Sequence, residues 1–173
     1  MYPLLEHQSV LRMERDRSGW RLERMTFDTA APRAIALSAD EKTLYVADGD
    51  TRGKARELRA YPILADASLG QPAVLHTFGG DYRGAHRGAE GLCVDSGGNL
   101  LACAGWNKSG PGPLVYVFSP SGAVLETQAL PCDSPMRIAF GDADLASFYL
   151  TTAEGSLYRA RGTGRRGVAR KNA

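Results

Sequence analysis

Apolar and polar residues alternate along most of this chain, which is the pattern of strands that bury one face. The clearest case is residues 89–106, where two apolar segments flank a Ser-Gly-Gly-Asn turn at 96–99. Glycine supplies the positive φ that a tight hairpin turn needs. The same alternation predicts a hairpin over residues 8–27, and no segment has sustained helical periodicity. The chain is therefore predicted to be all-β.

Three pairs of predicted strands superimpose on one another: PRAIALSADEKTLYVAD, AEGLCVDSGGNLLACAG and PMRIAFGDADLASFYLTT. Aligning Ile35, Leu92 and Ile138 gives separations of 57 and 46 residues. A propeller blade of four antiparallel strands repeats every ~40 to 50 residues. The repeat therefore predicts a partial β-propeller of about three to four blades. The strand count gives the outer two strands of one blade, two complete blades and at least three strands of another.

Composition supports one globular unit of blades over residues 1–162, with 43% hydrophobic and 23% charged residues among the 173. Residues 163–173 form a basic tail, which the composition predicts to be disordered rather than to bind nucleic acid. The sequence contains neither an apolar run of membrane-spanning length nor a signal peptide, so we expect no membrane association and a cytoplasmic location by default. A half-ring leaves apolar blade faces in water at both ends. We expect further protein, or a second copy in a homodimer, to close it.

Three cysteines, Cys93, Cys103 and Cys132, cannot all pair within one chain, and none has the spacing of a zinc site. We expect buried free thiols. A disulfide between Cys93 and Cys103, on opposite arms of one hairpin, is the alternative.

One carboxylate stands out from the turn residues. Glu90 lies at the start of a predicted strand, after the polar, glycine-rich segment DYRGAHRG. A carboxylate in that position is predicted to face a cavity. The alternative is a solvated turn residue.

The repeated segments, together with ELRAYPILADASLGQP, RGAEGLCVDSGGNLLACAGW and GPLVYVFSPSGAVLET, resemble the gluconolactonase, senescence marker protein and luciferin-regenerating enzyme family. The resemblance spans nearly the whole chain in consecutive order and matches the C-terminal half of a six-bladed ring. It implies hydrolysis of sugar lactones or related esters with one divalent cation, often calcium, magnesium or zinc, in the central channel.

The resemblance places two positions of the family's metal site on this chain. The family's Asn in a Pro-Asn-Gly segment corresponds to Arg33 in Pro-Arg-Ala, and its Asp in an Asp-Gly pair corresponds to Glu90 in Glu-Gly. Glu90 is thereby implied to be a metal ligand and the base that activates water. Arginine cannot bind a metal ion. Arg33 therefore has two interpretations. It binds an anionic substrate or the developing oxyanion, or it is a substitution that removed the metal site.

Three further residues complete the predicted substrate site. His86 lies in the polar approach to Glu90, and its alternative interpretation is a surface-loop histidine. Trp106 and Asn107 follow the hairpin at 89–106 and are expected to line the channel mouth, although Trp106 equally suits packing between blades.

Two functions from different classes fit these observations. The first is a metal-dependent hydrolase of the gluconolactonase type that acts on small-molecule lactones or esters and is impaired because the N-terminal half is absent. The second is a non-catalytic propeller module, or an inactive truncated remnant. Arg33 and the family's missing first ligand, a glutamate, favour the second function, and the resemblance over the whole length favours the first.

Overall fold

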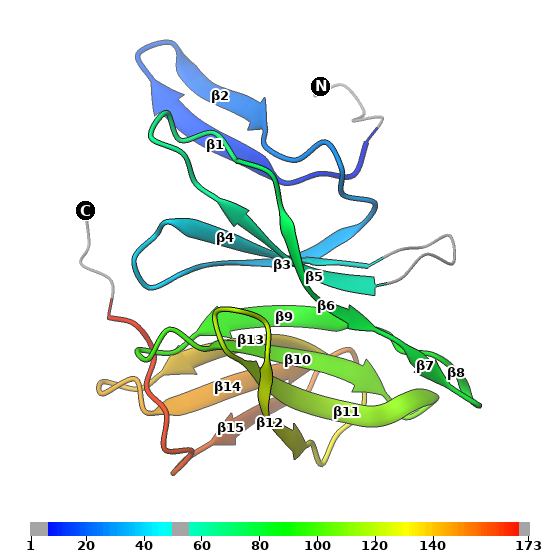
Figure 1. Ribbon diagram of the computed structural model, residues 1–173. Coiled ribbons are helices and arrows are strands. Elements are labelled where there is room, and N and C mark those ends of the chain that lie inside the picture. The colour runs from blue at the N-terminus through cyan, green and yellow to red at the C-terminus, as the bar shows by residue number, and fades with distance from the viewer. Residues whose placement is uncertain (1–6, 50–55, 170–173) are drawn as a thin grey trace.

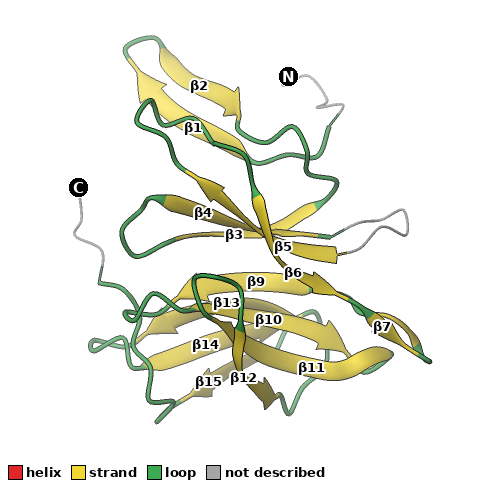
Figure 2. Ribbon diagram, in the orientation of Figure 1, coloured by secondary structure: helices red, strands yellow, loops and turns green. Residues whose placement is uncertain are grey.

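The protein is described by a computed structural model over residues 7–49 and 56–169. Those residues form strands and loops without a helix, and therefore nothing in them can cross a membrane as a helical span (Figures 1 and 2). The strands are β1 (Leu11–Asp16), β2 (Gly19–Arg24), β3 (Pro32–Leu37), β4 (Thr43–Asp48), β5 (Arg56–Pro62), β6 (Ala73–Phe78), β7 (Gly80–Asp81), β8 (Gly84–Ala85), β9 (Ala89–Val94), β10 (Leu100–Trp106), β11 (Ser109–Phe118), β12 (Val124–Ala129), β13 (Pro135–Gly141), β14 (Ser147–Thr152) and β15 (Leu157–Ala160).

Two complete blades and two incomplete blades account for the main sheets. The complete blades are the antiparallel meanders β3-β4-β5-β6 and β9-β10-β11-β12. The hairpin β1-β2 precedes them, β13-β14-β15 follows them, and the short hairpin β7-β8 extends from the first complete blade. This arrangement confirms the all-β partial propeller and its predicted strand count. Gly98 has the positive φ of 82° expected of the turn in the central hairpin.

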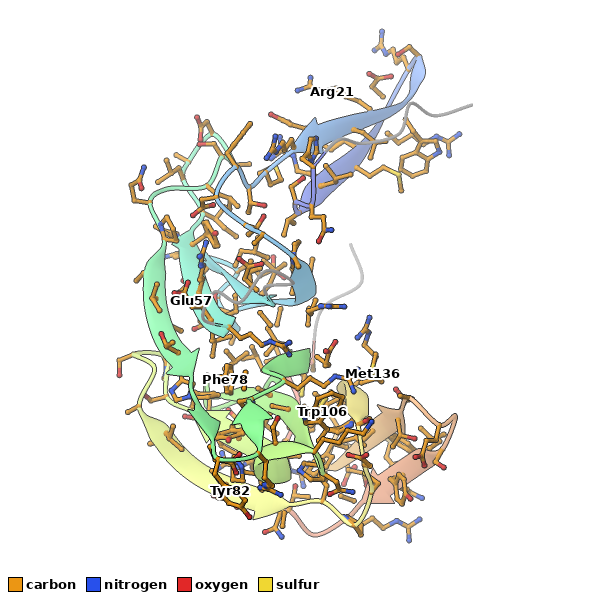
Figure 3. All side chains as sticks on the ribbon, turned by 90° about the vertical axis from the view of Figure 1, so that its right-hand side faces the viewer. Arg21, Glu57, Phe78, Tyr82, Trp106 and Met136 are labelled. Atoms are coloured by element: carbon orange, nitrogen blue, oxygen red, sulfur yellow. The ribbon has the colours of Figure 1, made fainter. Side chains whose placement is uncertain are left out.

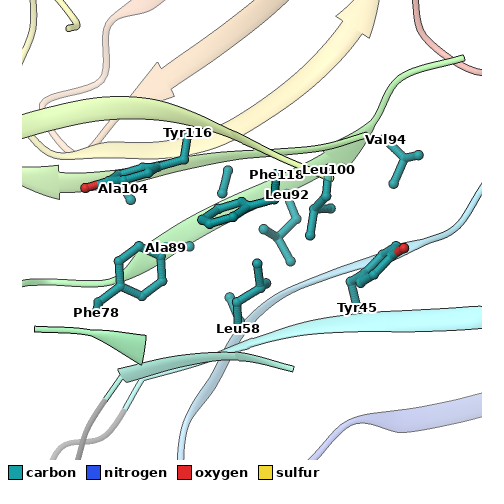
Figure 4. Close-up of a cluster of buried hydrophobic side chains, with 12 residues drawn as sticks. Tyr45, Leu58, Phe78, Ala89, Leu92, Val94, Leu100, Ala104, Tyr116 and Phe118 are labelled. Atoms are coloured by element: carbon teal, nitrogen blue, oxygen red, sulfur yellow. The ribbon is translucent and has the colours of Figure 1, made fainter. Parts of the chain in front are cut away.

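Each blade packs face to face on the next. Between the two complete blades, Leu58 on β5 and Phe118 on β11 are both fully buried and lie opposite one another (Figure 4). A second cluster joins β10 and β11 to Ile138 and Leu150 of the last blade. A third places Val10, ahead of β1, against β4 and β5. The three clusters stack the blades into about half a ring.

The first strand of each blade lies on the concave side, where β3, β9 and β13 are neighbours. Gly91 on β9 is needed for this approach, because a Cβ atom there would lie 2.7 Å from the Cα of Arg137 and 2.9 Å from the backbone nitrogen of Ile138. The N-terminal ends of these three strands therefore meet at one end of the concave face.

The apolar end face that the half-ring predicts is present on the first hairpin. Cross-strand pairing puts Met13 opposite Leu22 and Trp20 opposite Arg15, and Met13, Trp20 and Leu22 are 59%, 61% and 49% exposed. The other face of the hairpin carries Arg12, whose guanidinium donates to Ala67 of the neighbouring blade. Of the two faces of this hairpin, the outward one therefore exposes the large apolar side chains to water.

The opposite end of the half-ring is more polar than predicted. On the outward face of the last blade, Asp142 accepts hydrogen bonds from Tyr149 Oη at 2.7 Å and from the Arg159 guanidinium. Cross-strand pairing places Tyr149 next to Arg159 on this face. The expectation of two apolar ends is thus confirmed at the first hairpin, whereas the last blade combines this polar group with an exposed Leu157.

The basic tail differs from the predicted disorder over its described residues, 163–169. Arg165 pairs with Asp95 at 2.8 Å and with Glu126 at 2.9 Å. The backbone of Gly167 donates to Leu145, and Val168 packs against the core between the complete blades. Residues 170–173 of the predicted tail lie outside the described residues. This segment is held in place because Arg165 pairs with the buried carboxylate of Asp95.

The cysteines lie in the blades as free thiols, as expected. Cys93 pairs across the ladder with Leu101, and Cys103 pairs with Gly91, so the two sulfurs do not form the alternative disulfide. Burial raises the pKa of both Cys93 and Cys103 to about 12. These thiols act as small apolar side chains.

Replacing Phe118 by Ala should remove the central contact between the complete blades. We expect the free energy of unfolding to fall by about 3–5 kcal/mol, because a large aromatic side chain is replaced by a cavity. Chemical denaturation measures this change. The matched control is Leu125→Ala on β12, where the side chain is 55% exposed and the change should stay within about 0.5 kcal/mol. Equal losses for the two variants would contradict the packing described here.

His86 should make stability depend on pH. Its ring is 4% exposed and stacks on Phe78 with a centroid distance of 4.9 Å. Burial, with a smaller contribution from the charge of Arg56, lowers the pKa of His86 from 6.5 to about 4. The unfolded chain therefore binds a proton that the folded chain excludes, and the stability from the neutral ring is complete above pH 6.5 and lost as pH falls toward 4.

We expect the free energy of unfolding to decrease by about 2 kcal/mol between pH 7 and pH 5 through this residue. Denaturant titrations at the two pH values measure the decrease. The variant His86→Gln should have a shallower pH dependence than the parent protein, and His7→Gln, close to the N-terminus, serves as the control. A parent-like slope in His86→Gln would show that another group controls the pH dependence.

Candidate functional site

Glu90 lies at the N-terminal end of β9, where the inner strands meet. The residue is only 3% exposed, and its Oε1 atom accepts a hydrogen bond from Nε of Arg87 at 3.1 Å. A solvated turn residue would not be enclosed in this way. The carboxylate instead belongs to a partly enclosed polar cluster on the concave side of the blades.

Arg87 connects this carboxylate to the last blade and to Trp106. Its Nη2 atom lies 3.6 Å from the sulfur of Met136, and its guanidinium lies 5.4 Å from the centre of the Trp106 ring. The Trp106 indole donates to Ser109 at 2.6 Å, which fixes the ring over the arginine. Figure 3 shows Trp106 and Met136 close together on the concave side, far from Arg21 at the first hairpin. Trp106 is therefore part of the Glu90 cluster.

A second arginine supports the backbone of the cluster. Nη1 of Arg137, on β13, donates to the backbone oxygen of Glu90 at 2.6 Å and to that of Met136 at 2.8 Å. These bonds cross from the last blade to β9, at the point where Gly91 permits the close approach of the strands. Arg137 thus fixes the start of the strand that carries Glu90.

An open cleft of about 380 Å³ lies beside the cluster. Arg33 and Arg137 line it from β3 and β13, and Ile35 and Leu92 form part of its apolar wall. Arg33 is exposed, and it makes no hydrogen bond or ion pair with another residue in 7–49 or 56–169. The cleft therefore combines apolar walls with two guanidinium groups.

Two of the predicted substrate residues lie away from this cleft. His86 is a core residue: Nδ1 accepts from the backbone of Gly88 at 2.8 Å, and Nε2 lies 3.3 Å from the hydroxyl of Tyr116. It is not the surface-loop histidine that was the alternative prediction. Asn107 is exposed, and its backbone bonds to Asp133 and Arg83 on the outside of the cluster. The structure therefore places Arg33 in the cleft and connects Glu90 with Trp106 through Arg87, while His86 and Asn107 make other contacts.

The donor set around Glu90 does not suit a divalent cation. Calcium and magnesium take six or more oxygen ligands, and zinc takes four oxygen, nitrogen or thiolate ligands. In the described part of the chain, no group of three or more acidic, histidine or cysteine side chains could hold a metal ion. The carboxylate of Glu90 accepts a hydrogen bond from the guanidinium of Arg87, whose Nη2 atom lies 3.6 Å from the sulfur of Met136. Of the two positions that the resemblance assigns to the metal site, only Glu90 can bind a metal ion, and its carboxylate is paired with the cation of Arg87.

Sequence reasoning missed the roles of Arg87 and Arg137. Arg87 precedes the carboxylate by three residues in a glycine-flanked segment, which was a usable signal for an ion pair. Arg137 follows Met136, the repeat position equivalent to Glu90, so the repeat itself could have placed it beside the site. Neither contact could be derived from one strand alone, since both depend on side chains that reach across the site.

Comparison with known proteins places the chain in a family. Residues 5–154 match the family described as the SMP-30/Gluconolactonase/LRE-like region. A 6-deoxy-6-sulfogluconolactonase from Pseudomonas putida is 30% identical over 148 residues, which cover 80% of this chain and 47% of that protein.

Solved structures agree with the match. The luciferin-regenerating enzyme superimposes with a TM-score of 0.70 at 23% identity, over 86% of this chain and 50% of the enzyme. A gluconolactonase from Xanthomonas campestris superimposes with a TM-score of 0.65 at 28% identity, over 92% of this chain and 46% of that protein. This chain thus spans about half the length of the relatives it matches. The family match covers most of its residues, and the chain belongs to the SMP-30, gluconolactonase and luciferin-regenerating enzyme family.

Proposed function

We propose that this chain provides the C-terminal half of a site that hydrolyses small-molecule sugar lactones. One observation carries the proposal: the buried residue Glu90 is joined through Arg137 to an open cleft in a propeller of the gluconolactonase family, because Arg137 lines that cleft and donates to the backbone oxygen of Glu90. Two relatives are named as lactonases, one of them for a sulfo-substituted gluconolactone. Lactonase chemistry needs a positioned base and a source of positive charge, and both are present among the described residues.

In this proposal Glu90 accepts a proton from water as the water oxygen attacks the lactone carbonyl carbon. The carbonyl oxygen then carries negative charge, which the guanidinium of Arg87 stabilises from beside the carboxylate. The ring C–O bond breaks, the proton passes from Glu90 to the leaving ring oxygen, and the product is the open hydroxy acid. Trp106 restricts Arg87 by covering its guanidinium, which keeps the charge in place.

The metal requirement that the resemblance implies does not fit the described residues. A resident divalent cation would polarise the lactone carbonyl, and Glu90 is the residue that would hold it. The remaining ligands would have to come from outside the described residues, while Arg87 already occupies one carboxylate oxygen. We therefore assign no step to a metal ion, and metal dependence remains an expectation that added calcium, magnesium or zinc can test.

A non-catalytic sugar-binding module is the second candidate. The observation that favours it is Arg33, a cation at a position where the family resemblance implies an amide ligand. Under this function the cleft binds a lactone or its hydroxy acid without turnover. The homodimer that would close the ring remains a prediction, and light scattering tests it, because a well-folded monomer would contradict closure by a second copy.

Replacing Glu90 by Gln should lower lactone hydrolysis by about 10²–10⁴-fold, because an amide cannot accept the proton from water. The rate is measured by acid release from glucono-δ-lactone, with chelator and with each metal added separately. The control is Glu154→Gln in the exposed β14–β15 turn, which should keep the parent rate.

Circular dichroism establishes that both variants are folded. Hydrolysis by the parent chain that Glu90→Gln leaves unchanged would rule out the proposed base. A folded parent chain that binds lactone but releases no acid under every metal condition would favour the binding module.

A further inference from the structure

The cleft contains two arginines, Arg33 and Arg137, to which the proposed hydrolysis assigns no role. Arg33 projects from the start of β3 and Arg137 from the start of β13, and both line the same cleft of about 380 Å³. The other lining residues are apolar or uncharged: Ser9, Val10, Leu11, Pro32, Ala34, Ile35 and Leu92. Among the described residues, no acidic side chain lines it. The described residues of the cleft therefore do not neutralise the charge on the two arginines.

The two guanidinium groups differ in how they are held. Nη1 of Arg137 is fixed by the backbone oxygens of Glu90 and Met136, and no other hydrogen bond of this guanidinium is found in the described part of the chain. Arg33 has no polar partner within residues 7–49 and 56–169, and its aliphatic part lies close to Gly49. Arg137 thus presents a positioned donor, and Arg33 keeps its full set of donors for a ligand.

A guanidinium pair of this kind recognises an oxyanion. The planar fork of arginine donates two parallel hydrogen bonds to a carboxylate, sulfonate or phosphate group. The carboxylate of Glu90, whose backbone oxygen accepts from Arg137, is already paired with Arg87. An incoming anion would therefore meet cationic donors in the cleft, while Ile35 and Leu92 would contact its carbon skeleton.

We propose that the Arg33–Arg137 cleft binds a second oxyanion, distinct from the lactone group, so that the substrate class is a sugar-acid lactone with an anionic substituent. The inference rests on the proposed hydrolysis for the lactone end of this ligand. The anion-binding end rests on Arg33 and Arg137 alone. The two parts can consequently fail separately.

The test is calorimetric titration of the whole chain with stable hydroxy acids, which need no turnover to be bound. The probes are gluconate, with one carboxylate, glucarate, with a second carboxylate, and 6-phosphogluconate, with a phosphate. We expect at least one of the two doubly anionic probes to bind about tenfold more tightly than gluconate at moderate ionic strength. Preference for glucarate assigns the site to carboxylates, and preference for 6-phosphogluconate assigns it to tetrahedral oxyanions. Equal affinity for all three probes overturns the proposal.

Variants locate the preference. The side chain of Arg33 is exposed and has no polar partner among the residues that the structure describes. Arg33→Gln should therefore reduce the tenfold preference to about equal affinity while unfolding at the parent temperature. Arg137→Lys keeps the charge but removes the fork and should weaken the preference severalfold. The matched control is Arg17→Gln in the distant β1–β2 turn, which should bind as the parent does. A preference that survives Arg33→Gln, or that Arg17→Gln reduces equally, overturns the assignment.

Hydrolysis measured on the same samples separates the two proposals. Loss of the preference in Arg33→Gln together with acid release by the parent chain supports both. The same loss without acid release from any lactone keeps the anion site and refutes the hydrolase.

Discussion

The face-to-face packing of one four-stranded sheet on the next is the constraint on which the rest of this structure depends. Leu58 and Phe118 are excluded from water only because the two complete blades lie against each other. The same stacking brings β3, β9 and β13 together as neighbours. The side chains at the starts of these strands are far apart in sequence, and blade packing alone gathers them at one end of the concave face.

At that end, charge rather than metal-ligand geometry organises the residues. Glu90 is enclosed and paired with Arg87, Arg137 bonds to the backbone of Glu90, and Arg33 lines the adjacent cleft. Three arginines in this region, of which one contacts the carboxylate, suit the recognition of an anion and of negative charge that develops during a reaction. They suit a divalent cation poorly, because like charges would surround it. The chain has the fold of the family, and the described residues around Glu90 carry positive charge.

The sequence allowed the architecture to be predicted closely, because alternation and the blade repeat are local signals that each strand pair carries by itself. The position of Glu90 at the start of an inner strand was also predictable, since the repeat and the resemblance point to the same place, and its role as base or ligand stays a prediction. The environment of His86 was not, because its polar, glycine-rich neighbours gave no sign that Phe78 and Tyr116 would enclose it. The order of the tail was missed for a similar reason. Its arginines suggest a solvated segment, and only the fold shows that Asp95 lies within reach of Arg165.

The docked tail has a consequence for the concave face. At the C-terminal ends of the inner strands, Gly167 and Val168 line a hollow together with Val94 and Phe140. The tail thus occupies the end of the concave face opposite to Glu90, and Arg165 anchors it there through Asp95 and Glu126. The wall of the concave face at that end is accordingly formed by a segment outside the blades as well as by the inner strands.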